Sequence, residues 1–246
     1  MLSTYQYVVA ALSVILSLGT VIVCVRQKCF YRYFFLNLYL LLITISTLAG
    51  QYLIHTVGYT SAQYFYFYFT SDAITNIICY LVIGAFFDQM FRQSFFARYV
   101  RPTLAFFFLL VILITGLYIA RSTDHLFSRF VLEFQQNMYF VGVLLTFLLW
   151  MSMMYLGAET RRFALLVSGL GIYFTAHAAS YAASFLSTSA QSFALQIPPV
   201  AYTLMTLVWL YTFLRVPEGE AAVEPARARG RPWAALPLPV RGKQNE

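Results

Sequence analysis

The sequence predicts an all-α polytopic membrane protein, a bundle of seven transmembrane helices with the N-terminus outside and the C-terminus inside. Three observations predict this class. Hydrophobic residues make up 61% of the 246 residues and charged residues only 10%, whereas a soluble domain is nearer half apolar and a quarter charged. Seven segments reach the length of about 20 apolar residues that a spanning helix needs. Basic residues between the segments fall almost entirely on one side of the predicted membrane.

The segments follow one another with short connections, so we expect sequential helices to pack as neighbours. The first segment has no basic start and is followed by Arg26 and Lys28, which predicts an N-out anchor rather than a cleaved signal peptide. The last segment opens at Pro198 and Pro199, residues that suit the first turn of a helix. The predicted spans are residues 5–25, 33–54, 64–87, 103–120, 133–156, 163–185 and 197–214.

The basic residues fix the predicted orientation. With seven spans, only Arg121 and Arg129 lie outside, against fourteen basic residues inside. An even number of spans would place some of the inner clusters outside, against the positive-inside rule. The inner residues are Arg26, Lys28, Arg32, Arg92, Arg98, Arg101, Arg161, Arg162, Arg215, Arg227, Arg229, Arg231, Arg241 and Lys243.

The composition divides the chain into a seven-helix transmembrane domain, residues 1–215, and a disordered basic cytoplasmic tail, residues 216–246. The tail is rich in Pro, Ala, Arg and Glu and lacks hydrophobic periodicity. Two roles stay open for it, a solvated end to the last helix or docking to anionic lipid through Arg227, Arg229 and Arg231. We assign the net charge of +7 to topology and lipid contact, and we expect no nucleic-acid binding.

Polar residues fall on one face of three of the predicted helices. A charged side chain within a span is costly and normally faces the interior of a bundle. Asp72 and His177 both lie about eight residues from the outer end of their helices, which is roughly 12 Å deep. The sequence therefore predicts an outward-opening cavity that binds a ligand, although the same groups could instead hydrogen-bond one another as structural contacts. The predicted cavity residues are Asp72, Asn76, Glu133, Gln136, Asn137, His177 and Tyr181.

Two further patterns predict packing. Gly171, Thr175, Ala179 and Ala183 form a ridge of small residues on the sixth helix, and such ridges let helix backbones approach closely. Asp88 stands four residues before Arg92, the spacing of an ion pair within one helix.

Several membrane chemistries lack their residues. A retinal Schiff base needs a buried lysine, and Lys28 and Lys243 both lie outside the predicted spans. Haem with two axial imidazoles needs paired histidines at depth, and His177 is the only histidine predicted there. The sequence holds no HExxH motif and no phosphate-binding glycine-rich loop. We therefore expect no cofactor, no metal site and no catalysis.

The segment from Tyr64 to Arg92 consists of an aromatic run, then Ser71 and Asp72, then an apolar helix. This pattern resembles that of uncharacterised bacterial multi-pass membrane proteins, and the resemblance implies the bacterial inner (plasma) membrane and no particular activity. The architecture also resembles bacterial seven-helix sensor modules, which normally feed a large cytoplasmic signalling domain. The short tail of this chain departs from that pattern, so signalling would have to pass through a partner.

Two functional hypotheses follow. The first is a sensor or accessory membrane protein that binds a small ligand or a membrane-protein partner through the outer cavity. The alternative is a small secondary transporter, coupled to protons or ions, that uses Asp72, Glu133 or His177. The first is favoured because no charge is predicted in the inner half of any span.

Overall fold

The computed structural model describes residues 4–92, 97–119, 126–156, 160–184, 194 and 196–217. Within them every regular element is a helix, and the seven long helices are long and apolar enough to cross a membrane. This confirms the predicted all-α class and the seven apolar helices. The helices are α1 (Thr4–Arg26), α2 (Phe34–Val57), α3 (Ala62–Phe91), α4 (Ala97–Ile119), α5 (Leu126–Leu156), α6 (Arg161–Ser184) and α8 (Ile197–Arg215).

Two helices begin earlier than the apolar pattern predicts. α4 begins at Ala97 rather than at residue 103, and Pro102 lies inside it. α5 begins at Leu126 rather than at residue 133, so Glu133 lies about two turns inside the helix instead of opening it. Hydropathy marks only the part of a helix that suits hydrocarbon, whereas backbone hydrogen bonding continues into its polar end.

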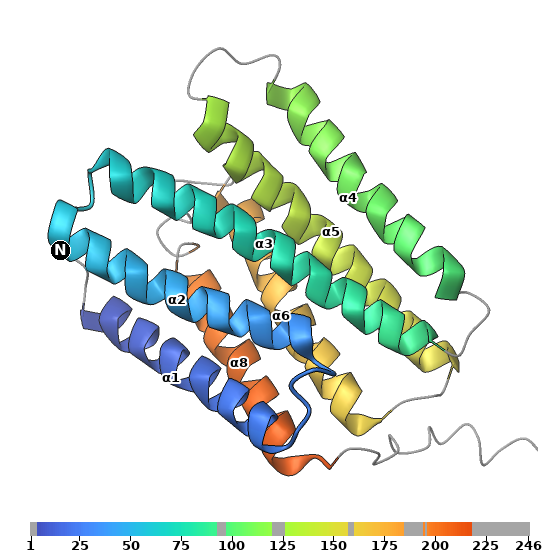
Figure 1. Cartoon of the computed structure of the whole chain (residues 1–246). Coiled ribbons are helices and arrows are strands. Elements are labelled where there is room, and N and C mark those ends of the chain that lie inside the picture. The colour runs from blue at the N-terminus through green and yellow to red at the C-terminus, as the bar shows by residue number, and fades with distance from the viewer. Residues whose placement is uncertain are drawn as a thin grey trace, which may run out of the picture.

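Six of the helices form a closed ring in the order α1, α2, α3, α5, α6 and α8, with α8 packed against α1. The fourth helix, α4, lies outside the ring in the angle between α3 and α5 (Figure 1). Sequential helices do pack as neighbours, as the short connections predict. The closing contacts, α3 on α5 and α8 on α1, join helices that are distant in sequence.

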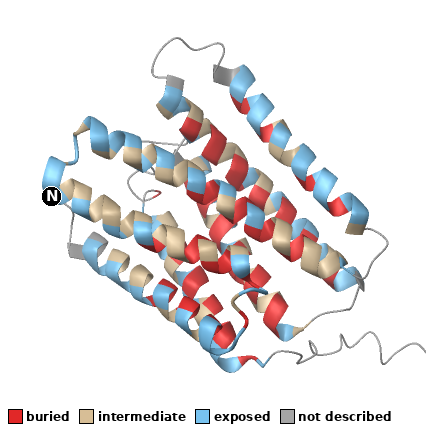
Figure 2. Ribbon diagram, in the orientation of Figure 1, coloured by how far each residue is buried: buried red, intermediate tan, exposed pale blue. Residues whose placement is uncertain are grey.

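The ring is filled by aromatic side chains at mid-height. Tyr39 of α2 is fully buried and lies edge-on to Tyr173 of α6 and to Tyr202 and Trp209 of α8. The Trp209 Nε1 donates to Leu166 O at 2.9 Å and ties α8 to α6. Figure 2 shows the buried residues gathered between the helices and α4 mostly exposed, as expected for a helix that contacts the bundle on one side only.

Two glycines allow the closest helix contacts. A Cβ atom at Gly142 of α5 would lie 2.3 Å from the Phe174 ring, and one at Gly169 of α6 would lie 2.8 Å from Trp209 Nε1. The ridge of small residues predicted on α6 does not form these close contacts, because Thr175 and Ala179 of the ridge are exposed. A row of small residues shows where backbones could approach, but the position of the bulky partner decides where they do.

Polar contacts hold α4 to α3. Arg101 of α4 donates to the carboxylate of Asp88, with Nη2 and Oδ2 3.0 Å apart. The predicted pair of Asp88 with Arg92 is therefore wrong, and the ion pair joins two helices instead of two turns of one. Nearby, the buried Tyr80 hydroxyl donates to Leu104 O at 2.5 Å.

Candidate functional site

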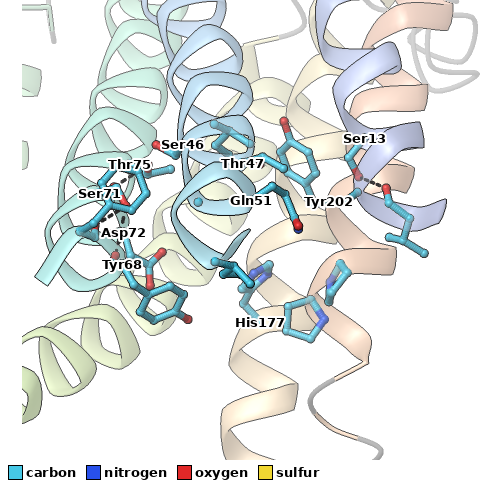
Figure 3. A pocket seen from close by; sticks show the side chains of 18 of the residues that line it. Ser13, Ser46, Thr47, Gln51, Tyr68, Ser71, Asp72, Thr75, His177 and Tyr202 are labelled. Atoms are coloured by element: carbon cyan, nitrogen blue, oxygen red, sulfur yellow. Dashed lines mark hydrogen bonds between the residues drawn. The ribbon is translucent and has the colours of Figure 1, made fainter. Parts of the chain in front are cut away.

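A cavity of about 430 Å³ lies inside the ring at the end where α1 begins and α2 ends. Every ring helix contributes to its lining, while α4 contributes no residue. We call this cavity the outer pocket (Figure 3). Its volume falls within the range of roughly 300–1,000 Å³ that is typical of small-molecule sites.

One wall of the outer pocket comes from a single face of α3. Tyr64, Tyr68, Asp72 and Thr75 all line it, and their spacing of three or four residues places them one above another on the helix. The start of this helix is fixed by Ser61, whose hydroxyl accepts from the Tyr64 N–H at 3.2 Å. The cap positions the aromatic run at the mouth and the carboxyl group of Asp72 about two turns below it.

A chain of hydrogen bonds runs from Asp72 across three helices. Gln135 of α5 donates its side-chain Nε2 to Asp72 Oδ2. The Oε1 of the same amide accepts from the Tyr181 hydroxyl of α6 at 3.1 Å. Gln135 is buried, so its amide is held at both ends and fixes the position of the Asp72 carboxyl group.

His177 of α6 lies at the base of the outer pocket between two tyrosine rings. Its ring centroid is 4.5 Å from that of Tyr139 and 4.1 Å from that of Tyr173. His177 Nδ1 lies 2.9 Å from Tyr173 O, a carbonyl that only accepts, so Nδ1 carries the proton. Nε2 has no hydrogen-bond partner among the described residues and remains available as an acceptor.

The opposite wall consists of α1 and α8, and Figure 3 shows Ser13 and Tyr202 across the pocket from Asp72. The Ser13 and Thr203 hydroxyls are 3.0 Å apart, and the buried Ser17 and Tyr202 hydroxyls are 2.7 Å apart. From α2 comes Gln51, whose buried Oε1 has no hydrogen-bond partner in the described part of the chain. The described residues of this wall therefore offer hydroxyl and amide groups but no charge.

The predicted cavity residues separate into two groups. Asp72 and His177 line the outer pocket, and Tyr181 reaches it through Gln135. The remaining four, Asn76, Glu133, Gln136 and Asn137, lie outside the lining.

These four residues have three different settings. Asn76 is buried one turn below Asp72, and its Nδ2 lacks a hydrogen-bond partner among the described residues. Asn137 faces the peripheral helix, where its Nδ2 donates to Thr115 Oγ1 of α4 at 3.1 Å. Glu133 and Gln136 are half-buried on the same side of α5.

The opposite end of the ring holds a buried arginine. Arg162, near the start of α6, is only 2% exposed. Its Nη2 donates to Gln27 Oε1 of α1 at 2.5 Å, and its guanidinium carbon lies 4.8 Å from the centre of the Phe213 ring of α8. We call Arg162, Gln27 and Phe213 the inner plug. The sequence predicts Arg162 just before the sixth span, and it is the second residue of α6. The burial of its side chain is what the sequence does not predict.

Two thiols lie beside the inner plug. Cys24 and Cys29 are both buried with their Sγ atoms 2.9 Å apart, and Asn37 Nδ2 donates to Cys24 Sγ at 3.3 Å. They pack at the end of α1 as small buried side chains.

The predicted lipid-binding residues Arg227, Arg229 and Arg231 lie outside the described residues, and the tail as a whole stays a prediction. Among the described residues, no three His, Cys, Asp or Glu side chains gather to hold a metal ion. No protein-family model, curated protein or solved structure matches this chain.

Proposed function

We propose that this chain is a multi-pass membrane protein of the sensor or accessory type that binds a small ligand in its outer pocket and performs no catalysis. The observation that carries the proposal is that all six ring helices converge on one cavity, with Asp72 as the one acidic side chain among its described lining residues. Groups that served only as structural contacts would have no need of a shared cavity. A cavity bounded by six helices also couples a bound ligand to the packing of the whole ring.

The orientation of the chain is part of this proposal. Nine described basic residues lie at the end of the helices opposite the outer pocket, and Arg129 lies at the pocket end. The positive-inside rule makes the basic end cytoplasmic, so the pocket would open to the outside of a bacterial inner membrane. The basic residues are Arg26, Lys28, Arg32, Arg92, Arg98, Arg101, Arg161, Arg162 and Arg215.

The cytoplasmic end of the ring would then transmit ligand binding to a partner protein. A ligand that changes the packing of α6 and α8 against α1 would shift the inner plug, because Arg162 and Phe213 belong to α6 and α8. A membrane-protein partner could detect that shift. Anionic lipid at the cytoplasmic face, bound by Arg227, Arg229 and Arg231, would hold the tail at the membrane.

A small proton- or ion-coupled transporter is the second candidate, and Arg162 favours it. Ionisable residues inside a membrane commonly mark ion pathways. Asp72 and Arg162 place one charge at each end of the ring interior. Fully buried Tyr39, Met205 and Trp209 separate the two ends, so transport would require these side chains to move.

A thermal-shift screen of the purified chain tests the proposal. A panel of ammonium compounds, carboxylates and sugars would be added to the wild type, to Asp72→Ala and to His177→Ala. We expect one class to raise the wild-type Tm while its effect is lost in both variants. If both variants change the Tm without ligand but respond to every class as the wild type does, the pocket is structural and the proposal is wrong.

The same panel in proteoliposomes separates the two candidates. A sensor or accessory protein binds the active class without moving it or protons across the bilayer. Asp72-dependent uptake, followed by radiolabelled ligand and by an internal pH dye, would replace the sensor proposal with the transporter.

A further inference from the structure

The outer pocket has an unbalanced charge. Among the described residues that line it, Asp72 is the one acidic side chain, and none of them is a lysine or an arginine. Asp72 has no salt-bridge partner within the described ranges, and the Gln135 amide is the only hydrogen-bond donor that reaches its carboxyl group there. The Asp72 carboxyl group therefore has a donor but no acceptor, an arrangement that suits the ionised form, which only accepts.

An ionised carboxylate that is removed from water without a cation is costly. A positively charged ligand in the pocket would offset that cost, and an anionic ligand would increase it. The charge of the lining thus favours one class of ligand before any shape is considered.

The rest of the lining favours an organic cation over a metal ion. Calcium and magnesium take about six or more oxygen ligands, whereas Asp72 is a single carboxylate and the neighbouring groups are mostly aromatic. Tyr68 lies one turn above Asp72 on α3, and Tyr139 lies one turn after Gln135 on α5. Tyrosine faces attract cations through the negative charge of the ring, so the face of Tyr68 would lie against a charged nitrogen held at Asp72. The ring of Tyr139 is already stacked on His177 and Tyr181, so it closes the base of the pocket.

We propose that the outer pocket binds an organic ammonium ion, with its nitrogen against Asp72 and its alkyl groups against the face of Tyr68. The serine, threonine and glutamine side chains that α1 and α2 contribute to the lining would then hydrogen-bond the polar end of the ligand. This inference deepens the proposed function and rests on it, since the pocket must admit a ligand.

Calorimetric titration of the full chain in lipid nanodiscs tests the charge requirement. The probes are choline and 3,3-dimethylbutan-1-ol, which has the same shape but a carbon atom in place of the charged nitrogen. Tetramethylammonium and benzyltrimethylammonium extend the series to smaller and larger cations. Sodium chloride at equal ionic strength serves as the blank.

We expect at least one of the three ammonium ions to bind saturably, and choline to bind at least tenfold more tightly than its neutral analogue. Equal binding of choline and the neutral analogue would overturn the inference and leave the pocket as a ligand site. The absence of saturable binding by all three ammonium ions would also overturn it. The screen of carboxylates and sugars then decides separately whether the proposed function survives.

Two pairs of variants locate the binding. Asp72→Asn keeps an oxygen that can accept from Gln135, and it should weaken ammonium binding at least tenfold, whereas Asp88→Asn, outside the pocket, should not change it. Tyr68→Phe keeps the ring face and should bind within twofold of the wild type, while Tyr68→Leu should lose about fivefold. Equal affinities for Asp72→Asn and Asp88→Asn would contradict the assignment even if choline binds.

Discussion

Each end of the six-helix ring contains one ionisable side chain in its interior, but the surroundings of the two side chains differ. At the cytoplasmic end of the proposed topology, the inner plug fills the interior, with the charge of Arg162 held against Gln27 and the Phe213 ring. At the other end, the carboxyl group of Asp72 lines an open cavity of about 430 Å³. His177 and Arg162 both lie on α6, fifteen residues apart in the sequence, which is roughly 22 Å along the axis.

Under the proposed function, the end with the inner plug serves packing and the end with the outer pocket holds the ligand. Removal of a side chain that is buried and packed leaves a cavity among its neighbours and lowers stability. A charge that faces a cavity has room for a partner from outside the chain. The variants below should therefore affect stability most at the inner plug and least at the peripheral helix.

The largest effect is expected at Arg162. Arg162→Ala removes the guanidinium from Gln27 and Phe213, and it should lower the free energy of unfolding by about 3 kcal/mol, the upper range for a hydrogen bond to a charged group. The neighbouring Arg161 is exposed, so Arg161→Ala is the matched control and should have little effect. Denaturation in nanodiscs measures the free energy of unfolding of both variants. Equal losses of free energy would show that the packing of Arg162 does not stabilise this end of the ring.

A smaller loss is expected at the glycine contact between α5 and α6. Gly142→Ala brings a Cβ atom within 2.3 Å of the Phe174 ring, and such overpacking costs about 1–3 kcal/mol. Gly116 of α4 has no atom within 4 Å of the corresponding position, so Gly116→Ala should keep or raise the Tm. A loss in Gly116→Ala as large as in Gly142→Ala would contradict the helix arrangement.

The next effect concerns the hydrogen bonds that hold Asp72. Gln135→Leu removes the amide that joins Asp72 to Tyr181, and we expect a loss of about 1–2 kcal/mol in unfolding free energy. Gln136→Leu changes the adjacent, half-buried amide outside the pocket and should be nearly neutral. Thermal denaturation compares the two variants. A larger loss of stability for Gln136→Leu would mean that the face of α5 with Gln136 points into the bundle, as the sequence predicts.

The smallest effect is expected where α4 meets α5. A double-mutant cycle of Thr115→Val and Asn137→Ala should give a coupling energy of about 0.6 kcal/mol, the average for hydrogen bonds between membrane helices. A coupling near zero would mean that the contact of Asn137 with Thr115 does not hold α4 to the ring.

Much of this fold could be predicted because the bilayer imposes length and polarity on each span. Residues 197–214 were predicted as the last span, and α8 runs from Ile197 to Arg215. The polar starts of α4 and α5 could not be found in the same way, since hydropathy does not detect a helix that continues past the hydrocarbon.

The candidate site was harder to predict than the fold. Asp72 and His177 stand out because ionisable residues are rare within spans. Gln135 was missed although it lies among Val131, Met138 and Tyr139 on the buried face of α5. In a soluble protein the buried face of a helix is the apolar one. In a membrane the face toward lipid is apolar as well, so hydrophobic periodicity could not show whether the amide of Gln135 or that of Gln136 points into the bundle.

Access to the ring interior tests the central claim most directly. Gln51 lines the outer pocket, and Leu40 is fully buried eleven residues earlier on nearly the same face of α2, which is roughly 17 Å deeper. Gln51→Cys and Leu40→Cys would be treated with a membrane-impermeant thiol reagent in intact spheroplasts, and the wild type, whose three cysteines are buried, gives the background. We predict labelling of Gln51→Cys from outside and none of Leu40→Cys. Labelling of Gln51→Cys only after permeabilisation, or equal labelling of both variants, would contradict an outward-opening pocket closed at its inner end.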